Sequence, residues 1–172
     1  MCEQSGLTWH ILSIGQVDGR ADFGELRTIQ PNGYVVPLLG RQFAHGILDC
    51  YSLVQDFYAR EMGIRLSDYT RDDDWWHHGQ DLYSLDRLRA EGFELIDGPM
   101  RRGDMILMQI RCKDVANHAG IFLGDTGLSE APNLHPVPNA MLHHLYGRLS
   151  ERVSYGGMWA QATRYIVRHK EA

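Results

Sequence analysis

The sequence predicts an α+β fold in which helices come early in the chain and pack on an antiparallel sheet. Two segments with helical apolar periodicity lie within the first 91 residues, and from residue 104 onward short apolar runs of strand type follow one another. Helices followed by a run of strands is the order of an α+β domain, not of repeated βαβ units. The chain has 172 residues, of which 44% are hydrophobic, so it is long enough to bury one sizeable core.

The beginning of the chain predicts a separate extension. We expect residues 1–30 to be an N-terminal extension or the remnant of a linker, and residues 31–172 to form the main domain. Two short strands are predicted within the extension, at Trp9–Ile14 and Leu26–Ile29, because apolar runs there are separated by turn residues. The segment is too short to form a domain by itself.

The first helix of the main domain is predicted to begin after Asp49. Asp is a preferred N-cap residue, because its carboxylate accepts hydrogen bonds from the free N–H groups of the first turn. Gly63 lies where a left-handed C-terminal cap is expected. The apolar residues between them recur at helical spacing and predict one buried stripe: Leu53, Val54, Phe57, Tyr58 and Met62.

Later elements follow from the same reasoning. A second helix is predicted over Gln80–Glu91, with Gly92 as its stop. The segment Thr126–Asn139 is rich in Pro and Asn and has no period, which predicts a loop. Four strands are expected, at Met105–Ile110, His118–Leu123, Ala140–Tyr146 and Thr163–His169.

Composition excludes several classes of protein. A formal charge of −5 argues against nucleic acid or an anionic membrane surface as a partner. No apolar run approaches the roughly 18 residues of a membrane span, and Met1–His10 lacks the pattern of a secretory signal. Three cysteines without a C-x-x-C pair predict neither a disulfide framework nor a zinc knuckle.

Cys50 is the one cysteine whose sequence context favours reactivity. It is the first residue of the predicted helix, where the positive end of the helix dipole stabilises a thiolate. We therefore expect a depressed thiol pKa and a role as nucleophile. The competing interpretation is a small, packed apolar residue, which is the commoner role of a cysteine at a helix start.

A nucleophilic cysteine needs a base, and the base needs an orienting group. His118 begins one predicted strand, and His143 lies on the next. Side chains on adjacent antiparallel strands can come within hydrogen-bond reach of each other. A helix-start cysteine packed against two strand histidines is the geometry of papain-like cysteine peptidases, so we expect a papain-like fold.

Several motifs together resemble the NlpC-type cell-wall peptidase family. The matching phrases are Gly40–Gly46, Asp49-Cys50-Tyr51-Ser52, Arg102–Leu107 and His118–Gly124. More narrowly, Pro37–Arg41, Trp75-Trp76 and Met141–Ser150 resemble the peptidase domain of lambda-like phage tail assembly proteins. The resemblance covers roughly Ile29–His169.

The resemblance implies hydrolysis of peptidoglycan stem peptides, usually between D-glutamate and the diamino acid. It places the nucleophile on Cys50, the base on His118 and the third, orienting residue on His143. The distance from His118 to His143 is 25 residues, so the loop Thr126–Asn139 is interpreted as an insertion. His144 and His135 remain alternatives for the third role, and no metal or cofactor is expected.

The resemblance also implies substrate contacts. Asp49 is expected to bind the free amine of the substrate. Trp75 and Trp76 either line a substrate groove, or one lies in the core and the other on a docking surface. Phe43 replaces a family tyrosine whose hydroxyl helps to bind the oxyanion, and Tyr51 places a bulky ring beside the nucleophile. The remaining expected substrate contact is Ser52.

The leading hypothesis is a tail-associated cysteine peptidase of a phage or prophage. Its expected partners are peptidoglycan peptides and other tail proteins, and its expected location is the host cytoplasm during assembly and then the virion tail. One alternative is a structural tail-tip protein that keeps the fold. The other is an amidase or acyltransferase that uses the same three residues.

Overall fold

The computed structural model describes residues 2–112 and 114–172, which fall into two compact units, Met1–Val36 and Pro37–Ala172. No helix in these described ranges is long and apolar enough to cross a membrane.

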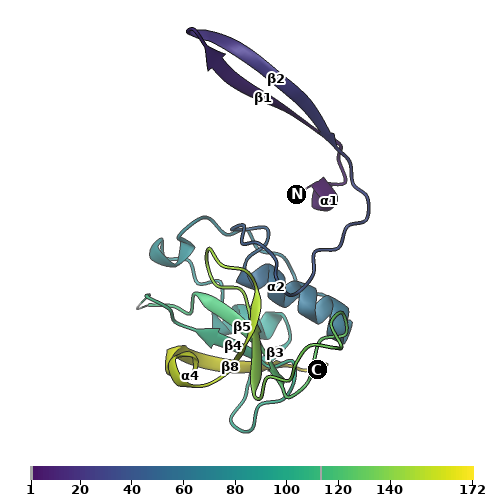
Figure 1. The fold of residues 1–172 in the computed structure, drawn as a ribbon. Coiled ribbons are helices and arrows are strands. Elements are labelled where there is room, and N and C mark those ends of the chain that lie inside the picture. Colours follow the sequence, from purple (N-terminus) through teal and green to yellow (C-terminus); the bar gives the residue numbers. More distant parts are fainter. Residues whose placement is uncertain (1, 113) are drawn as a thin grey trace. The chain divides into compact units, whose positions relative to one another are not determined.

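The first unit is a β-hairpin preceded by one helical turn (Figure 1). The turn is α1 (Cys2–Ser5), and the strands are β1 (Trp9–Val17) and β2 (Arg20–Ile29). Both strands are longer than expected, because Asp18 and Gly19 take positive φ angles of 49° and 77° and join them by a two-residue turn. An Asp-Gly pair between two runs of strand type is the sequence signal for such a turn, so this pair accounts for the full length of the hairpin.

The second unit is built on a six-stranded sheet in which every neighbouring pair is antiparallel. The strand order is β3-β8-β4-β5-β6-β7. In chain order the strands are β3 (Phe93–Leu95), β4 (Met105–Met108), β5 (His118–Gly124), β6 (Ala140–His143), β7 (Glu151–Ser154) and β8 (Thr163–His169). The architecture therefore mixes helices with an antiparallel sheet, as expected, but strands dominate it.

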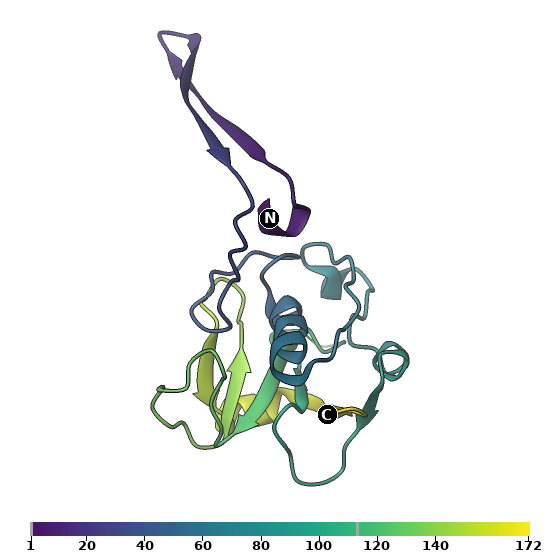
Figure 2. The same ribbon diagram turned by 90° about the vertical axis from the view of Figure 1, so that its right-hand side faces the viewer.

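The helix that follows Asp49 forms as predicted. Helix α2 (Cys50–Phe57) continues into one π-helical turn, η1 (Tyr58–Met62), and Gly63 ends it with a φ of 72°. The predicted stripe is buried apart from Met62, which packs at the edge of the core. Figure 2 shows α2 lying across one face of the sheet.

The remaining helical segments are short. The predicted helix over Gln80–Glu91 is confirmed only as α3 (Leu85–Ala90). Its first part is a turn, in which the Asp81 carboxylate accepts a hydrogen bond from the Tyr83 backbone N–H, and Leu82 and Tyr83 enter the core. A 3₁₀ turn, η2 (Trp75–His77), and helix α4 (Gly157–Ala162) complete the unit, and neither was predicted.

Two other expectations were wrong in detail. Strand β6 stops at His143, not Tyr146, because a turn closed by the Arg148 N–H and the Leu145 carbonyl reverses the chain into β7. Strands β3 and β7 were not anticipated: β3 has three residues, and β7, Glu-Arg-Val-Ser, carries only one strongly apolar side chain.

The sheet separates two apolar layers. Side chains alternate between the faces of a strand, so Met105 and Leu107 of β4 join the large core beneath α2. Ile106 and Met108 point to the other face and pack with Trp159 of α4. By the same alternation His118 and His143 share the α4 face, and the rings of both contact Trp159.

Candidate active site

Cys50 is the first residue of α2, and Asp49 caps the helix. The Asp49 carboxylate accepts a hydrogen bond from the Ser52 N–H at 2.9 Å, and the Ser52 hydroxyl accepts one from the Asp49 N–H at 2.7 Å. This reciprocal capping box fixes where the helix begins. The predicted helix-start position of Cys50 is therefore confirmed.

Cys50 and His118 line the same cavity, which has a volume of about 820 Å³. Elements on both sides of the sheet contribute to its wall, including the turn at Trp75, the segment that follows β4 and helix α4. Its other polar and aromatic walls include Phe43, Asp49, Tyr51, Arg71, Trp75, Trp76, Arg111, His144, Tyr146, Arg148 and Trp159. A pocket of this size is large enough for a short peptide segment.

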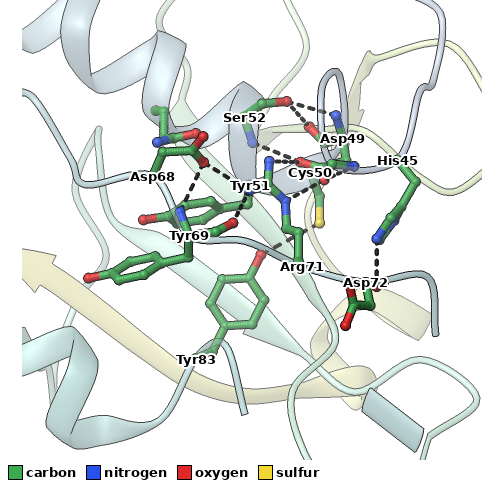
Figure 3. Close-up of polar contacts among 12 residues, drawn as sticks. His45, Asp49, Cys50, Tyr51, Ser52, Asp68, Tyr69, Arg71, Asp72 and Tyr83 are labelled. Atoms are coloured by element: carbon green, nitrogen blue, oxygen red, sulfur yellow. Dashed lines mark hydrogen bonds and ion pairs between the residues drawn. The ribbon is translucent and has the colours of Figure 1, made fainter. Parts of the chain in front are cut away.

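The Cys50 sulfur lies 3.5 Å from the Tyr83 hydroxyl, and Figure 3 shows that hydroxyl pointing at the sulfur. Burial and then the charge of Asp49 raise the pKa of the Cys50 thiol to about 11. Hydrogen bonds from Tyr83 and the Ala119 backbone, together with Arg71, favour the thiolate but do not offset burial. The expected depressed pKa is therefore wrong: desolvation outweighs the helix terminus, and the resting thiol is neutral.

His118 and His143 form a buried histidine pair. The Nε2 atom of His118 lies 3.1 Å from the Nδ1 atom of His143, with the two rings almost perpendicular. Burial, and secondarily the neighbouring histidines, lowers the pKa to about 3 for His118 and about 4 for His143. Both rings are consequently neutral at pH 7, and Nδ1 of His118 is left outside this contact.

The other two candidates for the third role make different contacts. Nε2 of His144 contacts the Arg148 carbonyl at 3.1 Å, and its ring packs edge-on against Phe43 at 5.2 Å. His135 is exposed, and its carbonyl accepts a hydrogen bond from Arg152. Of the three histidines, only His143 is hydrogen-bonded to His118.

Asp49 is already fully engaged within the chain. One carboxylate oxygen accepts from Ser52 N–H and from Arg71, and the other accepts from Gly46 N–H and from Arg71. Figure 3 shows the Arg71 guanidinium facing this carboxylate. A direct contact between Asp49 and a substrate amine would have to displace one of these donors, which the sequence-based interpretation did not foresee.

The other expected substrate contacts divide into two groups. Phe43, Tyr51, Trp75 and Trp76 all line the cavity, whereas Ser52 is occupied by the helix cap. Tyr51 is held by its own hydrogen bond to the Ser67 carbonyl at 2.7 Å, so its ring is fixed. The two interpretations of the tryptophans combine, because Trp75 is also buried in the core and Trp76 is half-buried beside it.

Two residues of the site were missed. Tyr83 lay on the predicted second helix, and Arg71 lay in a segment for which neither helix nor strand was predicted, so periodicity gave no signal for either. The buried polar group at Asp49 required a cationic partner, but the sequence could not say which arginine supplies it. Among the described residues, no His, Cys, Asp and Glu side chains are grouped as a metal site requires.

Comparison with known proteins gives consistent matches. The model of the NlpC/P60 family matches residues 40–168. The chain is 41% identical over 99% of its length to "Tail tip assembly protein K" of Escherichia phage N15, and 34% identical over 97% to the protein of that name from Escherichia phage lambda. It spans 61% and 70% of those two relatives. No solved structure matches the chain significantly.

Proposed function

The chain belongs to the NlpC/P60 family, whose fold is papain-like, and we propose that it is a cysteine peptidase that cleaves peptidoglycan stem peptides. Cys50 is the proposed nucleophile, His118 the general base and His143 the residue that orients it. The observation that carries the proposal is the shared cavity of Cys50 and His118, with His118 held by His143 through Nε2. That contact leaves Nδ1 of His118 outside the pair, and Nδ1 is the proposed basic atom.

The proposed acylation step begins from a neutral pair. As the Cys50 sulfur attacks the scissile carbonyl carbon, its proton passes to Nδ1 of His118. His118 then protonates the leaving amine as the C–N bond breaks, and a thioester remains on Cys50. Water, deprotonated by His118, attacks the thioester and releases the carboxylic acid and the free thiol.

The resting geometry sets a condition on this step. Cys50 is hydrogen-bonded to Tyr83 and not to His118 in the described structure, and the thiol is neutral. Substrate binding must therefore bring the sulfur away from Tyr83 and within about 3 Å of the base. Cys50 would lose its proton to His118 as it attacks, instead of reacting as a preformed thiolate.

The oxyanion of the intermediate needs a hydrogen-bond donor. Phe43 cannot supply the hydroxyl of the tyrosine that it replaces. The backbone N–H of Cys50 is the proposed donor, because N–H groups in the first turn of a helix have no partner within the helix.

The charges of the cavity suit a stem peptide, which carries free carboxylates. Arg111 and Arg148 line the cavity with exposed side chains, and neither forms an ion pair with any described residue. Arg71, in contrast, is neutralised by Asp49 and Asp68. We assign carboxylate recognition to the two free arginines and cleavage to the D-glutamyl–diamino acid bond.

The relatives' names support a proposed role in a phage tail. Because two proteins called "Tail tip assembly protein K" match almost the whole chain, the proposed partners are other tail proteins. The proposed location is the host cytoplasm during assembly, followed by the virion tail.

Incubation of the protein with purified muropeptides, with products identified by mass spectrometry, tests this function. The expected result is cleavage after D-glutamate by the parent chain and by Cys112→Ala, but not by Cys50→Ala. Cleavage that persists in Cys50→Ala would overturn the assignment of the nucleophile.

A second function is favoured by one observation: the neutral thiol that is hydrogen-bonded away from the base. This geometry also suits a tail-tip protein that keeps the fold, assembles with other tail proteins and has little or no activity. Tail assembly by the Cys50→Ala variant distinguishes the two functions. A purely structural protein would assemble infectious tails with alanine at position 50 and would cleave no muropeptide.

A further inference from the structure

One polar atom of the histidine pair is buried without a hydrogen-bond partner. Nε2 of His143 is buried, and no described group lies within hydrogen-bond distance and geometry of it. The nearest carboxylate oxygen belongs to Glu151, at 3.7 Å. A buried ring nitrogen without a hydrogen-bond partner destabilises the fold. The Glu151 carboxylate is the described group placed to become that partner.

Register explains why the two residues face each other. His143 is the last residue of β6 and Glu151 is the first residue of β7, and they are directly opposite in the antiparallel pair. Opposed residues of such a pair extend their side chains on the same face of the sheet. Glu151 is half exposed and His143 is fully buried, so the carboxylate closes the solvent side of the ring.

The tautomer of His143 determines whether His118 can act as a base. A neutral imidazole carries one hydrogen, on either Nδ1 or Nε2. If His143 carries its hydrogen on Nε2, its Nδ1 accepts a hydrogen bond from Nε2–H of His118, and Nδ1 of His118 keeps a free lone pair. If His143 carries its hydrogen on Nδ1, His118 must accept through Nε2, and its Nδ1 is then protonated and cannot take a proton.

We propose that Glu151 is a positioning residue that holds His143 in the Nε2–H tautomer and thereby keeps Nδ1 of His118 unprotonated. A carboxylate accepts hydrogen bonds and cannot donate them when ionised, so it favours a ring nitrogen that bears hydrogen. A shift of roughly 0.5–1.0 Å in the half-exposed Glu151 side chain closes the 3.7 Å separation to a hydrogen bond.

The other neighbours of His143 do not supply this function. On β5 the facing ionisable group is His118, and on α4 the ring of Trp159 packs at 4.5 Å without an acceptor. His144 is the other titratable neighbour, and it lowers the pKa of His143 through repulsion of positive charge. Glu151 is therefore the one anion among the described groups that faces this ring.

The tautomer itself is the direct test, and it does not depend on catalysis. Two-bond ¹H–¹⁵N correlation spectra of the ¹⁵N-labelled full chain at pH 7.5 report which ring nitrogen of each histidine bears hydrogen. His143→Asn and His118→Asn spectra assign the signals. The variants are Glu151→Ala, which removes the acceptor, and Glu151→Gln, which keeps a neutral one. Glu94→Ala is the matched control, since Glu94 is an exposed strand glutamate paired with Lys170.

The parent, Glu151→Gln and Glu94→Ala chains are expected to show His143 as Nε2–H, and Glu151→Ala is expected to show a mixture of tautomers. An unchanged His143 tautomer in folded Glu151→Ala would overturn the proposal. The catalytic consequence rests on the proposed function: kcat should fall about tenfold in Glu151→Ala with KM nearly unchanged, and Glu151→Gln should recover part of the loss. A parent chain that cleaves no muropeptide would refute that function and leave the tautomer result to decide the present inference.

Discussion

The guanidinium of Arg71 donates two hydrogen bonds to the carboxylate of Asp49, at 2.6 and 3.1 Å, and both side chains are only 4% exposed. Because Asp49 also caps α2, the loop that carries Arg71 is tied directly to the residue before the proposed nucleophile. The pair is thus both a structural anchor and one wall of the cavity.

We predict that Arg71→Leu lowers the free energy of unfolding by about 3–5 kcal/mol, because it leaves a buried carboxylate without its cation. Arg71→Lys should lower the free energy of unfolding by a smaller amount than Arg71→Leu, but still lower it, since lysine cannot form the two-pronged contact. Urea denaturation at pH 7 measures both. Arg89→Leu is the control, because Arg89 pairs with Asp86 on the exposed surface and should change stability by less than about 1 kcal/mol. A loss below about 1 kcal/mol in Arg71→Leu would show that the pair contributes no net stability.

The second prediction concerns the reactivity of Cys50. The rate of its alkylation by iodoacetamide should keep rising through pH 9 toward the thiol pKa of about 11, instead of levelling near neutrality. Tyr83→Phe should slow the reaction at a given pH, because it removes a hydrogen bond that favours the thiolate. Mass spectrometry of the Cys50 peptide across pH measures this, with the Cys112 peptide as the internal control. A plateau below about pH 8 would restore the preformed thiolate that the sequence suggested.

The local signals of the sequence identified α2 correctly and its electrostatics incorrectly. A capping aspartate, a stripe of apolar residues and a terminal glycine all lie within the short segment from Asp49 to Gly63, so they determine the helix and the place of Cys50 at its start. The thiol pKa depends instead on burial, and on contacts with residues distant in sequence such as Tyr83. Local pattern contains no information about that desolvation.

Strand register, which the sequence pattern did not give, determines which histidine meets His118. Sequence pattern placed His118 and His143 on neighbouring strands but left His144 and His135 open. The observed register sets Gly120 opposite His143, and this stagger brings Nε2 of His118 within 3.1 Å of Nδ1 of His143. Strand β7, and with it Glu151, could not be predicted because its four residues have no apolar alternation.

The third prediction concerns the effect of pH on stability. The folded pKa values of His118 and His143, about 3 and about 4, lie below the ordinary value of 6.5. The unfolded chain therefore binds more protons below about pH 6.5, and the stability from these neutral rings is present above that pH and lost progressively as pH falls toward 4 and 3. Urea denaturation from about pH 8 to about pH 5 should show declining stability. The double variant His118→Asn/His143→Asn should show a weaker decline in stability. An equal decline would show that these two histidines do not cause it.

The fourth prediction concerns the loop Thr126–Asn139, which the spacing of the histidines indicates to be an insertion but which is anchored to the core. Leu128 is buried in the main core, and the Ser129 N–H and hydroxyl both contact Glu61. Leu128→Ala should therefore cost about 2–4 kcal/mol, as truncation of a buried leucine does. Leu134→Ala in the same loop is the control, because Leu134 is exposed and should cost less than about 0.5 kcal/mol. Equal effects of the two changes would mean that the loop is not anchored by Leu128.

The last prediction separates the three histidines that follow β5 by what each contacts. His143→Ala should lower kcat for muropeptide cleavage by about 10²-fold or more, with little change in KM, because it removes the contact that fixes the ring of His118. His144→Ala should act mainly on KM, since His144 lines the cavity but is not bonded to His118. His135→Ala should leave both constants nearly unchanged, because its side chain is exposed outside the cavity. Steady-state kinetics on one purified muropeptide measures all three, and thermal melts identify variants that are simply misfolded. A crippled His135→Ala, or a His143→Ala that keeps its kcat, would move the orienting role away from His143.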